Sequence, residues 1–227
     1  MDTVLTPIKR RLRRMQRRRK VGRAYDMALE IAKLIPTNSR VLDVGCGNGF
    51  IAHHLTALLQ TPVVGLDVGD SVSAQIAYQQ FDGRHFPVPD QSFDAVLFCY
   101  VLHHAQDAAL LINEARRVLR TGGVMIIYED NPVHWWDKAV CWTHNLQWRG
   151  RTGPCTFRLE SAWRDLFTGC GFEVFSQRQL SRWRNMAHPV SRNFFVVRTA
   201  VTNKAARLNH KDTKTQLRSE TVPQFVS

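Results

Sequence analysis

The segment from Val41 to Phe50 constrains the fold more than any other part of this sequence. It reads VLDVGCGNGF, a short apolar run that leads into three alternating glycines and then into a helical pattern. Glycines at such a turn allow positive φ angles and let a ligand lie against main-chain amides at the start of a helix. A dinucleotide-binding fingerprint would need its third glycine at position 50, which Phe50 occupies. The segment therefore predicts a ligand-binding turn between a strand and a helix, and it counts against a dinucleotide.

Residues 40–130 alternate short apolar runs with helical patterns. The runs predict strands at 41–44, 63–67, 95–98 and 124–129, and helices at 49–59, 71–78 and 108–119. This alternation is typical of right-handed crossovers and a parallel sheet. Two more apolar runs, at 172–176 and 194–197, follow a helix predicted at about 159–170 and are joined by a helix-free link. They predict an antiparallel pair at the sheet edge.

The charge of the chain is concentrated at its two ends. The 227 residues carry 31 Lys and Arg against 19 Asp and Glu, which gives a formal net charge of +12. Ten basic residues and one acid fall in 1–24, five basic and two acidic residues fall in 199–227, and the segment between is formally neutral. We therefore expect a basic amphipathic N-terminal arm at 1–24, a single domain at 25–198 and a polar, disordered tail at 199–227.

The arm combines apolar residues at helical spacing with a dense run of Arg and Lys. Leu5, Ile8, Leu12 and Met15 predict one amphipathic helix, and a second helix is predicted at 24–35. An excess of positive charge of this kind favours a polyanionic partner. Contact through residues 8–23 with a membrane surface or with nucleic acid is the expectation, and the choice between them stays open.

The apolar runs and the cysteines indicate in which cellular compartment the protein is expected. No apolar run approaches the ~20 residues that span a bilayer, and the N-terminus lacks the apolar core of ~7 to 15 residues typical of a secretory signal. The five cysteines are an odd number and lie mostly in apolar stretches, which favours reduced thiols. We expect a soluble, cytoplasmic protein, either free or peripheral to a membrane.

Several motifs occur together in a recognisable order. They are VLDVGCGNGF at 41–50, VGLD at 64–67, DG at 82–83, FPVPDQSFD at 86–94, VLHH at 101–104 and RVLRTGG at 117–123. In order and spacing the chain resembles the class I S-adenosylmethionine-dependent methyltransferases, most closely the small-molecule type that includes ubiquinone and menaquinone biosynthesis methyltransferases. The resemblance covers about residues 25–198. It implies a Rossmann-like, doubly wound α/β fold with a seven-stranded, mostly parallel sheet and an antiparallel edge hairpin.

The resemblance also implies where S-adenosylmethionine would bind. Asp43 would lie near the ammonium of its methionine moiety, and Asp67 would bind the ribose hydroxyls. Asp82 would meet the adenine edge, although only fourteen residues separate it from Asp67, where the family commonly has about twenty. The complete set of expected cofactor-binding residues is Asp43, Gly45, Cys46, Gly47, Gly49, Asp67, Val68, Asp82, Gly83 and Cys99.

Methyl transfer from a sulfonium is an in-line displacement, so orientation in a dry site matters more than a nucleophilic side chain. If the acceptor must lose a proton, a base near neutral pKa helps, and His103 and His104 follow the fourth predicted strand directly. His104 is the catalytic candidate, and packing or helix capping is the competing interpretation of the pair. Tyr100 is a further candidate for the cavity wall.

The end of the same strand bears on the acceptor. Methyltransferases that act on the exocyclic amines of bases typically carry an Asn/Asp-Pro-Pro-aromatic motif there, whereas this chain has FCYV at 98–101. A carbon or oxygen of a small, lipid-like or quinone-like acceptor is therefore expected, with the Trp-rich segment 135–148 as its apolar cover. An RNA methyltransferase that uses the Arg-rich arm and a non-catalytic cofactor-binding protein stay open as alternatives.

The sequence contains one set of potential metal ligands. Cys141, His144 and Cys155 contain the right atoms for zinc, but three ligands at irregular spacing do not match a zinc motif. The expectation is that the protein holds no metal.

Overall fold

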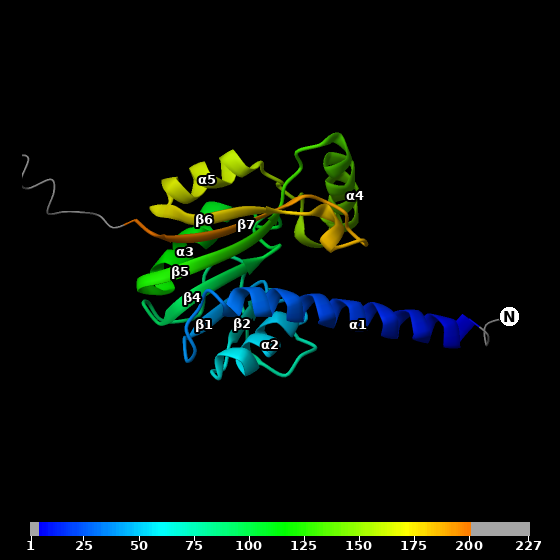
Figure 1. Cartoon of the computed structure of the whole chain (residues 1–227), viewed down its shortest axis with the longest axis horizontal. Coiled ribbons are helices and arrows are strands. Elements are labelled where there is room, and N and C mark those ends of the chain that lie inside the picture. The colour runs from blue at the N-terminus through cyan, green and yellow to red at the C-terminus, as the bar shows by residue number, and fades with distance from the viewer. Residues whose placement is uncertain (1–4, 201–227) are drawn as a thin grey trace, which may run out of the picture.

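A seven-stranded sheet in the order β3-β2-β1-β4-β5-β7-β6 forms the centre of the molecule (Figure 1). The computed structural model describes residues 5–200, so 1–4 and 201–227, with nearly all of the predicted tail, lie outside the described residues. The strands are β1 (Val41–Val44), β2 (Val64–Asp67), β3 (Ala77–Gln80), β4 (Phe93–Cys99), β5 (Leu119–Asp130), β6 (Phe172–Leu180) and β7 (Arg192–Thr199). Strands β1 to β5 are parallel to one another, and β7 pairs antiparallel with both β5 and β6. The predicted fold class is confirmed.

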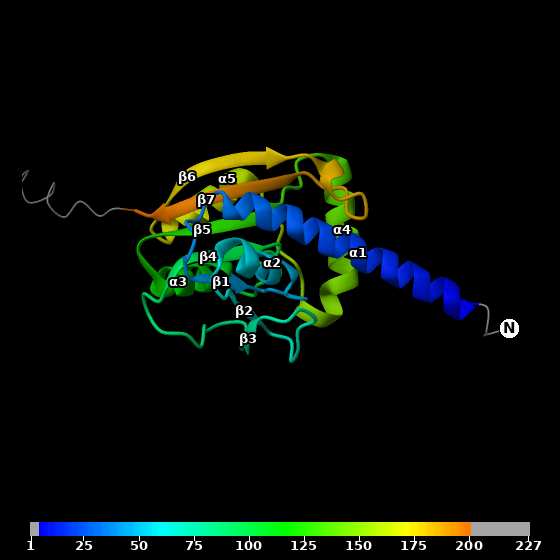
Figure 2. The same cartoon turned by 60° about the horizontal axis from the view of Figure 1, so that its bottom comes forward.

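Helices cover both faces of this sheet, as Figures 1 and 2 show from two sides. Their bounds are α1 (Leu5–Ala32), α2 (Phe50–Leu59), α3 (Ala108–Val118), α4 (Trp135–Thr152) and α5 (Glu160–Gly169), with a short 3-10 helix at Arg182–Arg184. The inner half of α1 and α2 pack on one face, while α3 and α5 pack on the other. Helix α4 stands apart from these layers, beyond the ends of the strands.

Strand β1 shows why the two faces have separate cores. Successive side chains of a strand point to opposite faces of the sheet. Leu42 and Val44 therefore join the core that contains Trp163 of α5, whereas Val41 joins the core that contains Ile31 of α1. All four of these apolar side chains on β1 and α1 are fully buried, as is Trp163. Asp43 lies between them in the strand and thus points toward the α1 and α2 side.

The prediction of two N-terminal helices is wrong, because residues 5–32 form the single helix α1. The break was expected near Lys20 and Arg23, where the sequence offers no apolar face. An α-helix can continue through such a stretch because its backbone hydrogen bonds do not require an apolar face. Gly22 lowers the stability of the helix by about 1 kcal/mol without ending it. The side chains of Arg11 and of residues 14–20 are exposed, and this outer part of α1 extends away from the sheet (Figure 2).

The predicted helix at 71–78 is also wrong. Residues 68–76 cross from β2 to β3 without a helix, and the chain then forms β3 in register with β2. The crossover packs on the glycine turn instead: the backbone N–H of Ala74 donates to the carbonyl of Asn48 at 3.0 Å. The segment with apolar residues at helical spacing is short, and it contains Ser71 and Ser73, which favour turns.

The carboxyl ends of β1, β2, β4 and β5 meet at one edge of the sheet, where ligands of open α/β sheets bind. The strand order reverses between β1 and β4, so the crevice lies there. Among residues 5–200, no helix is both long and apolar enough to cross a membrane.

Candidate active site

The glycine turn between β1 and α2 has the conformation that the sequence predicts. Gly45, Gly47 and Gly49 have φ angles of 69°, 54° and 74°, in the left-handed region that favours glycine. A Cβ on Gly45 would come within 2.4 Å of the Val101 side chain, and one on Gly49 within 2.6 Å of Val72. The backbone of the turn thus lies where only a glycine fits, and Cys46 at its centre is half-buried.

Asp67 at the end of β2 is tied to this turn. One carboxylate oxygen accepts a hydrogen bond from the Gly47 N–H at 2.7 Å, and the other accepts from Gly69 N–H at 3.1 Å. A carboxylate offers about four lone-pair sites, so two remain for a ligand with adjacent hydroxyls. Val68, the next residue, is 55% exposed beside it.

Asp43 is a buried acid inside the crevice. Its side chain is 1% exposed, and Oδ2 has no hydrogen-bond partner among the described residues. Burial, with the charge of Asp67 adding to it, raises the pKa of Asp43 to about 7. A buried carboxylate without a partner is costly, and a cationic ligand group would relieve this cost.

Asp82 and Gly83 lie in the loop after β3. The Asp82 carboxylate accepts the backbone N–H groups of Arg84 and His85, both at 2.7 Å. These hydrogen bonds, that of His85 first, lower the pKa of Asp82 to about 2. A Cβ on Gly83 would lie 3.3 Å from Val68, so this loop stands next to the end of β2. The structure brings Asp82 to the same edge as Asp67, although its carboxylate is engaged within its own loop.

The end of β4 forms the opposite wall of the crevice. Burial and the nearby carboxylate of Asp43 raise the pKa of the Cys99 thiol, so the thiol stays protonated. Tyr100 has a φ of 63°, a strained value for a non-glycine residue, and its N–H donates to the carbonyl of Tyr128 at 2.8 Å. This turn places Val101 against Gly45.

The two histidines after β4 have different surroundings. His103 is buried, and its Nδ1 lies 2.6 Å from a carboxylate oxygen of Glu129 on β5. His104 is half-buried and contacts His144 of α4, with 3.3 Å between their Nε2 atoms. Burial and the charges of His103 and His144 lower the pKa of His104 to about 3. The ring is thus neutral near pH 7 but binds a proton weakly, which does not favour the role of base predicted for it.

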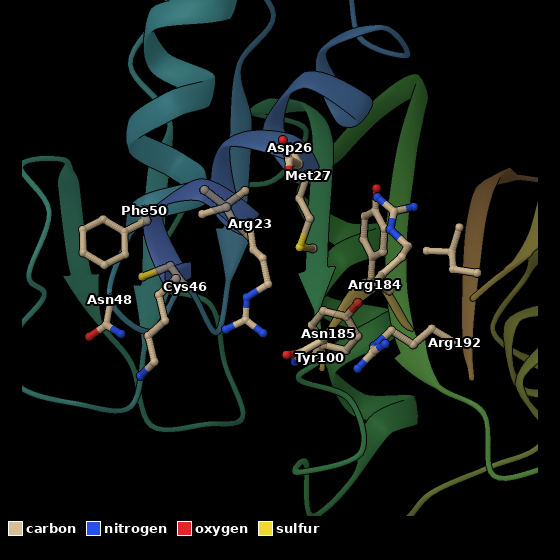
Figure 3. A pocket seen from close by; sticks show the side chains of 15 residues that line it. Arg23, Asp26, Met27, Cys46, Asn48, Phe50, Tyr100, Arg184, Asn185 and Arg192 are labelled. Carbon is tan, nitrogen blue, oxygen red and sulfur yellow. The ribbon is translucent and has the colours of Figure 1, made fainter. Parts of the chain in front are cut away.

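A cavity of about 350 Å³ opens between the glycine turn and Arg192, the first residue of β7. In Figure 3, Cys46, Asn48 and Phe50 line one side, while Tyr100 and Arg192 line the other. Arg23 of α1 also points into this space, so the last residues of the predicted arm contribute to the site.

Positive charge dominates this cavity. Arg192 is 2% exposed; its Nε pairs with Asp130 at 3.4 Å, while Nη1 is buried and has no hydrogen-bond partner among residues 5–200. Within the same residues no carboxylate forms an ion pair with Arg23. Burial and the neighbouring charge of Arg192 lower the pKa of Arg23 from its ordinary value. Lys20, Arg23, Arg184 and Arg192 line the cavity, and Asp26 is the one acid among its described lining residues. Asp130, which pairs with Arg192 and His188, lies outside that lining.

Sequence reasoning missed the acids at the end of β5 and the arginine on β7. Glu129 and Asp130 form an acidic pair at the carboxyl end of a predicted strand, the same signal that singled out Asp67. Arg192 begins β7, and no pattern in the sequence marks it as a cavity residue. His144, which the sequence groups only with Cys141 and Cys155, lies with His103 and His104 in the structure.

Known proteins share this chain's sequence over its central part. Residues 42–127 match the family described as methyltransferase domain. The chain is similar to the 27-O-demethylrifamycin SV methyltransferase of Amycolatopsis mediterranei, with 32% identity over 108 residues that cover 41% of this chain and 40% of that protein. It is also similar to a sterol 24-C-methyltransferase of Aspergillus fumigatus, with 33% identity over 122 residues that cover 44% of this chain and 32% of that protein. Each match spans less than half of the relative's own length.

A solved structure shares the fold. The S-adenosylmethionine-dependent methyltransferase from Methanosarcina mazei superimposes with a TM-score of 0.60 at 17% identity, over 75% of this chain and 96% of that one. Residues 42–127 of the chain therefore match a methyltransferase domain, and the chain shares its fold with S-adenosylmethionine-dependent methyltransferases, whose cofactor is S-adenosylmethionine.

Proposed function

We propose that this protein transfers a methyl group from S-adenosylmethionine to a carbon or oxygen of a small, partly apolar acceptor with an anionic group. The observation that carries the proposal is the cavity between the glycine turn and Arg192, with one wall suited to the cofactor and the other to an anion. The relatives act, by their names, on a rifamycin oxygen and on a sterol carbon, which supports both acceptor atoms.

The cofactor side follows the residues predicted from the sequence. The buried, unpartnered Oδ2 of Asp43 suits the ammonium of the methionine moiety, and the two remaining lone-pair sites of Asp67 suit the ribose hydroxyls. The other proposed contacts are Gly45, Cys46, Gly47 and Gly49 for the methionine moiety, Val68, Asp82 and Gly83 for the adenosine, and Cys99 beside the methionine. When bound, the cofactor supplies a methyl group on a positively charged sulfur.

The protein's own residues would orient the acceptor and exclude water. Met27, Ile51 and Leu180 give the cavity apolar lining, which suits a lipid-like or quinone-like body. Arg23 and Arg192 would hold a carboxylate or phosphate by charge-assisted hydrogen bonds. Such binding would direct the acceptor atom toward the glycine turn, and positioning of this kind accounts for much of the catalysis of an in-line displacement.

The cofactor site is tested by calorimetry with S-adenosylhomocysteine. Asp67→Ala removes two charge-assisted hydrogen bonds, about 1.5–3 kcal/mol each, and should weaken binding by roughly 10² to 10⁴-fold. Asp70→Ala, an exposed acid three residues away, is the matched control and should bind normally. Unchanged affinity in the Asp67 variant would refute the assignment of the cofactor site.

The anionic acceptor is tested with Arg23→Met, since Arg23 is only half-buried and its loss should leave the fold intact. S-adenosylhomocysteine also carries a carboxylate, so its affinity should stay within about twofold of the wild-type value if Arg23 serves the acceptor. A tenfold loss would assign Arg23 to the cofactor and contradict the proposal. Arg19→Met, an exposed arginine on the same helix, is the control.

A cell extract supplied with isotopically labelled S-adenosylmethionine identifies the acceptor. The labelled product should bind an anion-exchange resin and should form more slowly with the Arg23→Met variant. A neutral labelled product would contradict an anionic acceptor.

We further propose that the exposed outer half of α1 contacts an anionic surface. Arg11, Arg14, Arg17, Arg18, Arg19 and Lys20 are exposed and extend beyond the domain. Deleting residues 1–18 should leave cofactor binding unchanged and should abolish sedimentation with anionic liposomes. Retention on RNA, lost in the same deletion while liposomes do not bind, would favour the RNA alternative.

A further inference from the structure

A cluster of three histidines, His103, His104 and His144, lies at the carboxyl end of β4. The first two come from the turn after β4, and the third comes from α4, forty residues further along the chain. One ring nitrogen of each lies within 4.8 Å of one ring nitrogen of the other two. We call these three residues the histidine cluster.

His103 is the most constrained member. It is 1% exposed, and its Nδ1 lies 2.6 Å from one oxygen of Glu129, which is itself fully buried. The other Glu129 oxygen accepts the N–H groups of Val101 at 3.1 Å and Leu102 at 2.7 Å, so this carboxylate is fixed in place. Because the carboxylate only accepts, Nδ1 carries the proton toward it, and Nε2 is the nitrogen left for another contact.

That second nitrogen has no partner. Nε2 of His103 is buried and makes no hydrogen bond within residues 5–200. Leaving a buried polar atom unsatisfied costs about 1–3 kcal/mol, so such an atom calls for an explanation. In metal sites, a carboxylate often binds one ring nitrogen of a histidine and so orients the other nitrogen toward the metal. His103 has this arrangement, with Nδ1 held by Glu129 and Nε2 available.

The other two rings have the spacing of two metal ligands. Their Nε2 atoms are 3.3 Å apart. Two nitrogens bound tetrahedrally to one zinc ion at 2.0–2.1 Å lie about 3.4 Å from each other. Cys155 Sγ lies 3.3 Å from Nδ1 of His104, on the side of the ring away from His144, and so helps to orient that ring.

Aromatic side chains surround the cluster. Phe157 stacks on His103 at 4.7 Å between ring centroids, and Trp148 packs against His104 at 5.2 Å, so aromatic rings shield the site from water.

We propose that His103, His104 and His144 bind one divalent transition-metal ion of the zinc or iron(II) class. Imidazole ligands select these ions, whereas magnesium and calcium prefer oxygen. Three histidines leave a fourth position, which an acceptor oxygen or a water would fill. With the metal bound, His104 is a ligand and not the catalytic base. The proposal does not depend on the proposed methyl transfer, since it stands on the cluster alone.

The test measures metal binding by the full-length chain. The protein is stripped with a chelator, dialysed and titrated with Zn²⁺, and metal content is read by mass spectrometry. About one equivalent per chain is expected, together with a rise in the thermal unfolding midpoint on addition of Zn²⁺. Co²⁺ should give the strong visible absorption of a tetrahedral site. Absence of both metal uptake and the cobalt spectrum would overturn the proposal.

Variants connect the metal to these residues. His103→Asn and His144→Asn should each lose the equivalent of metal and the cobalt spectrum, while His53→Asn on α2, an exposed histidine, should keep both. Circular dichroism checks that each variant is folded. Metal binding that survives in both cluster variants would refute the site. Should either variant fail to fold, the cobalt spectrum and the Zn²⁺-dependent stability of the wild-type chain still decide the matter.

Cys155→Ser then tests whether the fourth position is open. Because Sγ of Cys155 faces Nδ1 of His104, away from the proposed metal, the wild type should show no near-ultraviolet sulfur-to-cobalt band and the variant should keep the visible cobalt spectrum. A sulfur-to-cobalt band that disappears in Cys155→Ser would place the metal elsewhere and overturn the three-histidine site. The spectrum answers this question without an activity measurement, so failure of the methyltransferase proposal and failure of the metal proposal are separable.

Discussion

Replacing Asp43 by Asn should make the protein more stable, and the gain should grow with pH. Asp43 is buried, and its pKa is raised from 3.8 to about 7. The folded protein therefore keeps a proton on Asp43 that the unfolded chain releases above about pH 4. Stability falls as the pH rises wherever the folded state binds more protons, so the wild-type protein loses stability from about pH 4 to about pH 7.

The magnitude follows from the shift. Each pKa unit corresponds to 1.36 kcal/mol, so the shift from 3.8 to about 7 amounts to about 4 kcal/mol in total. About 3 kcal/mol of this loss in the free energy of unfolding occurs between about pH 5 and about pH 8. Asn resembles the protonated acid in shape and cannot ionise, so the variant avoids this loss.

Urea unfolding at several pH values measures the effect. The free energy of unfolding of Asp43→Asn minus that of the wild type should rise by about 3 kcal/mol between about pH 5 and about pH 8. Asp70→Asn, which removes an exposed acid nearby, should show no such rise. A difference between Asp43→Asn and wild type that does not change with pH would refute the burial argument.

Cofactor binding gives an independent check of the same carboxylate. If ionised Asp43 binds the ammonium of the methionine moiety, only molecules with an ionised Asp43 bind the cofactor well. With a pKa of about 7, the fraction of such molecules rises about tenfold from about pH 6 to about pH 8. The affinity for S-adenosylhomocysteine should rise by a similar factor in the wild type. Asp43→Asn should bind weakly and with little dependence on pH over that range.

Four further substitutions test the fold and the turn. Gly45→Ala combines a positive φ with a 2.4 Å contact to Val101 and should abolish S-adenosylhomocysteine binding, whereas Gly122→Ala, with a φ of 80° but open space, should destabilise the chain and leave that binding intact. Trp163→Ala should cost about 3–5 kcal/mol in urea unfolding, since the side chain is fully buried; a cost below about 1 kcal/mol would contradict its place in the core. Glu30→Gln breaks the ion pairs of α1 with Arg178 and Arg184 and should cost about 1–3 kcal/mol, measured in the same way.

The elements that the sequence predicts well are those whose pattern is local. The apolar run at 41–44 and the alternation that follows it suffice for the parallel sheet, and β1 has the predicted bounds. The sequence also predicts the antiparallel pair of β6 and β7, because two consecutive apolar runs have no long helical pattern between them. The predicted link is helix-free, and the structure corrects this with the 3-10 helix at Arg182–Arg184. The glycine turn required nothing beyond the spacing of its glycines.

The features that escaped prediction depend on tertiary contacts. The helical spacing at 71–78 is real, but Val72 and Ile76 pack on the glycine turn, and Ala77–Gln80 pairs with β2. His144 meets His104 only because α4 is turned toward the end of β4, an orientation that no periodicity encodes. The raised pKa of Asp43 likewise arises from burial between α1 and α2, which the sequence of β1 alone does not contain.

The continuity of α1 has a mechanical consequence. At 1.5 Å per residue, Arg11 lies about 18 Å along the helix axis from Arg23 at the cavity. Glu30 anchors the inner end of the same rod to the Tyr128 hydroxyl at 2.6 Å and to arginines of the β6–β7 region. The charged outer half is therefore a stiff spacer and not a loose tether. A surface that binds the outer half of α1 would therefore hold the mouth of the cavity at a fixed distance and in a fixed orientation. An acceptor bound to the same surface would then lie at a fixed position relative to the cavity.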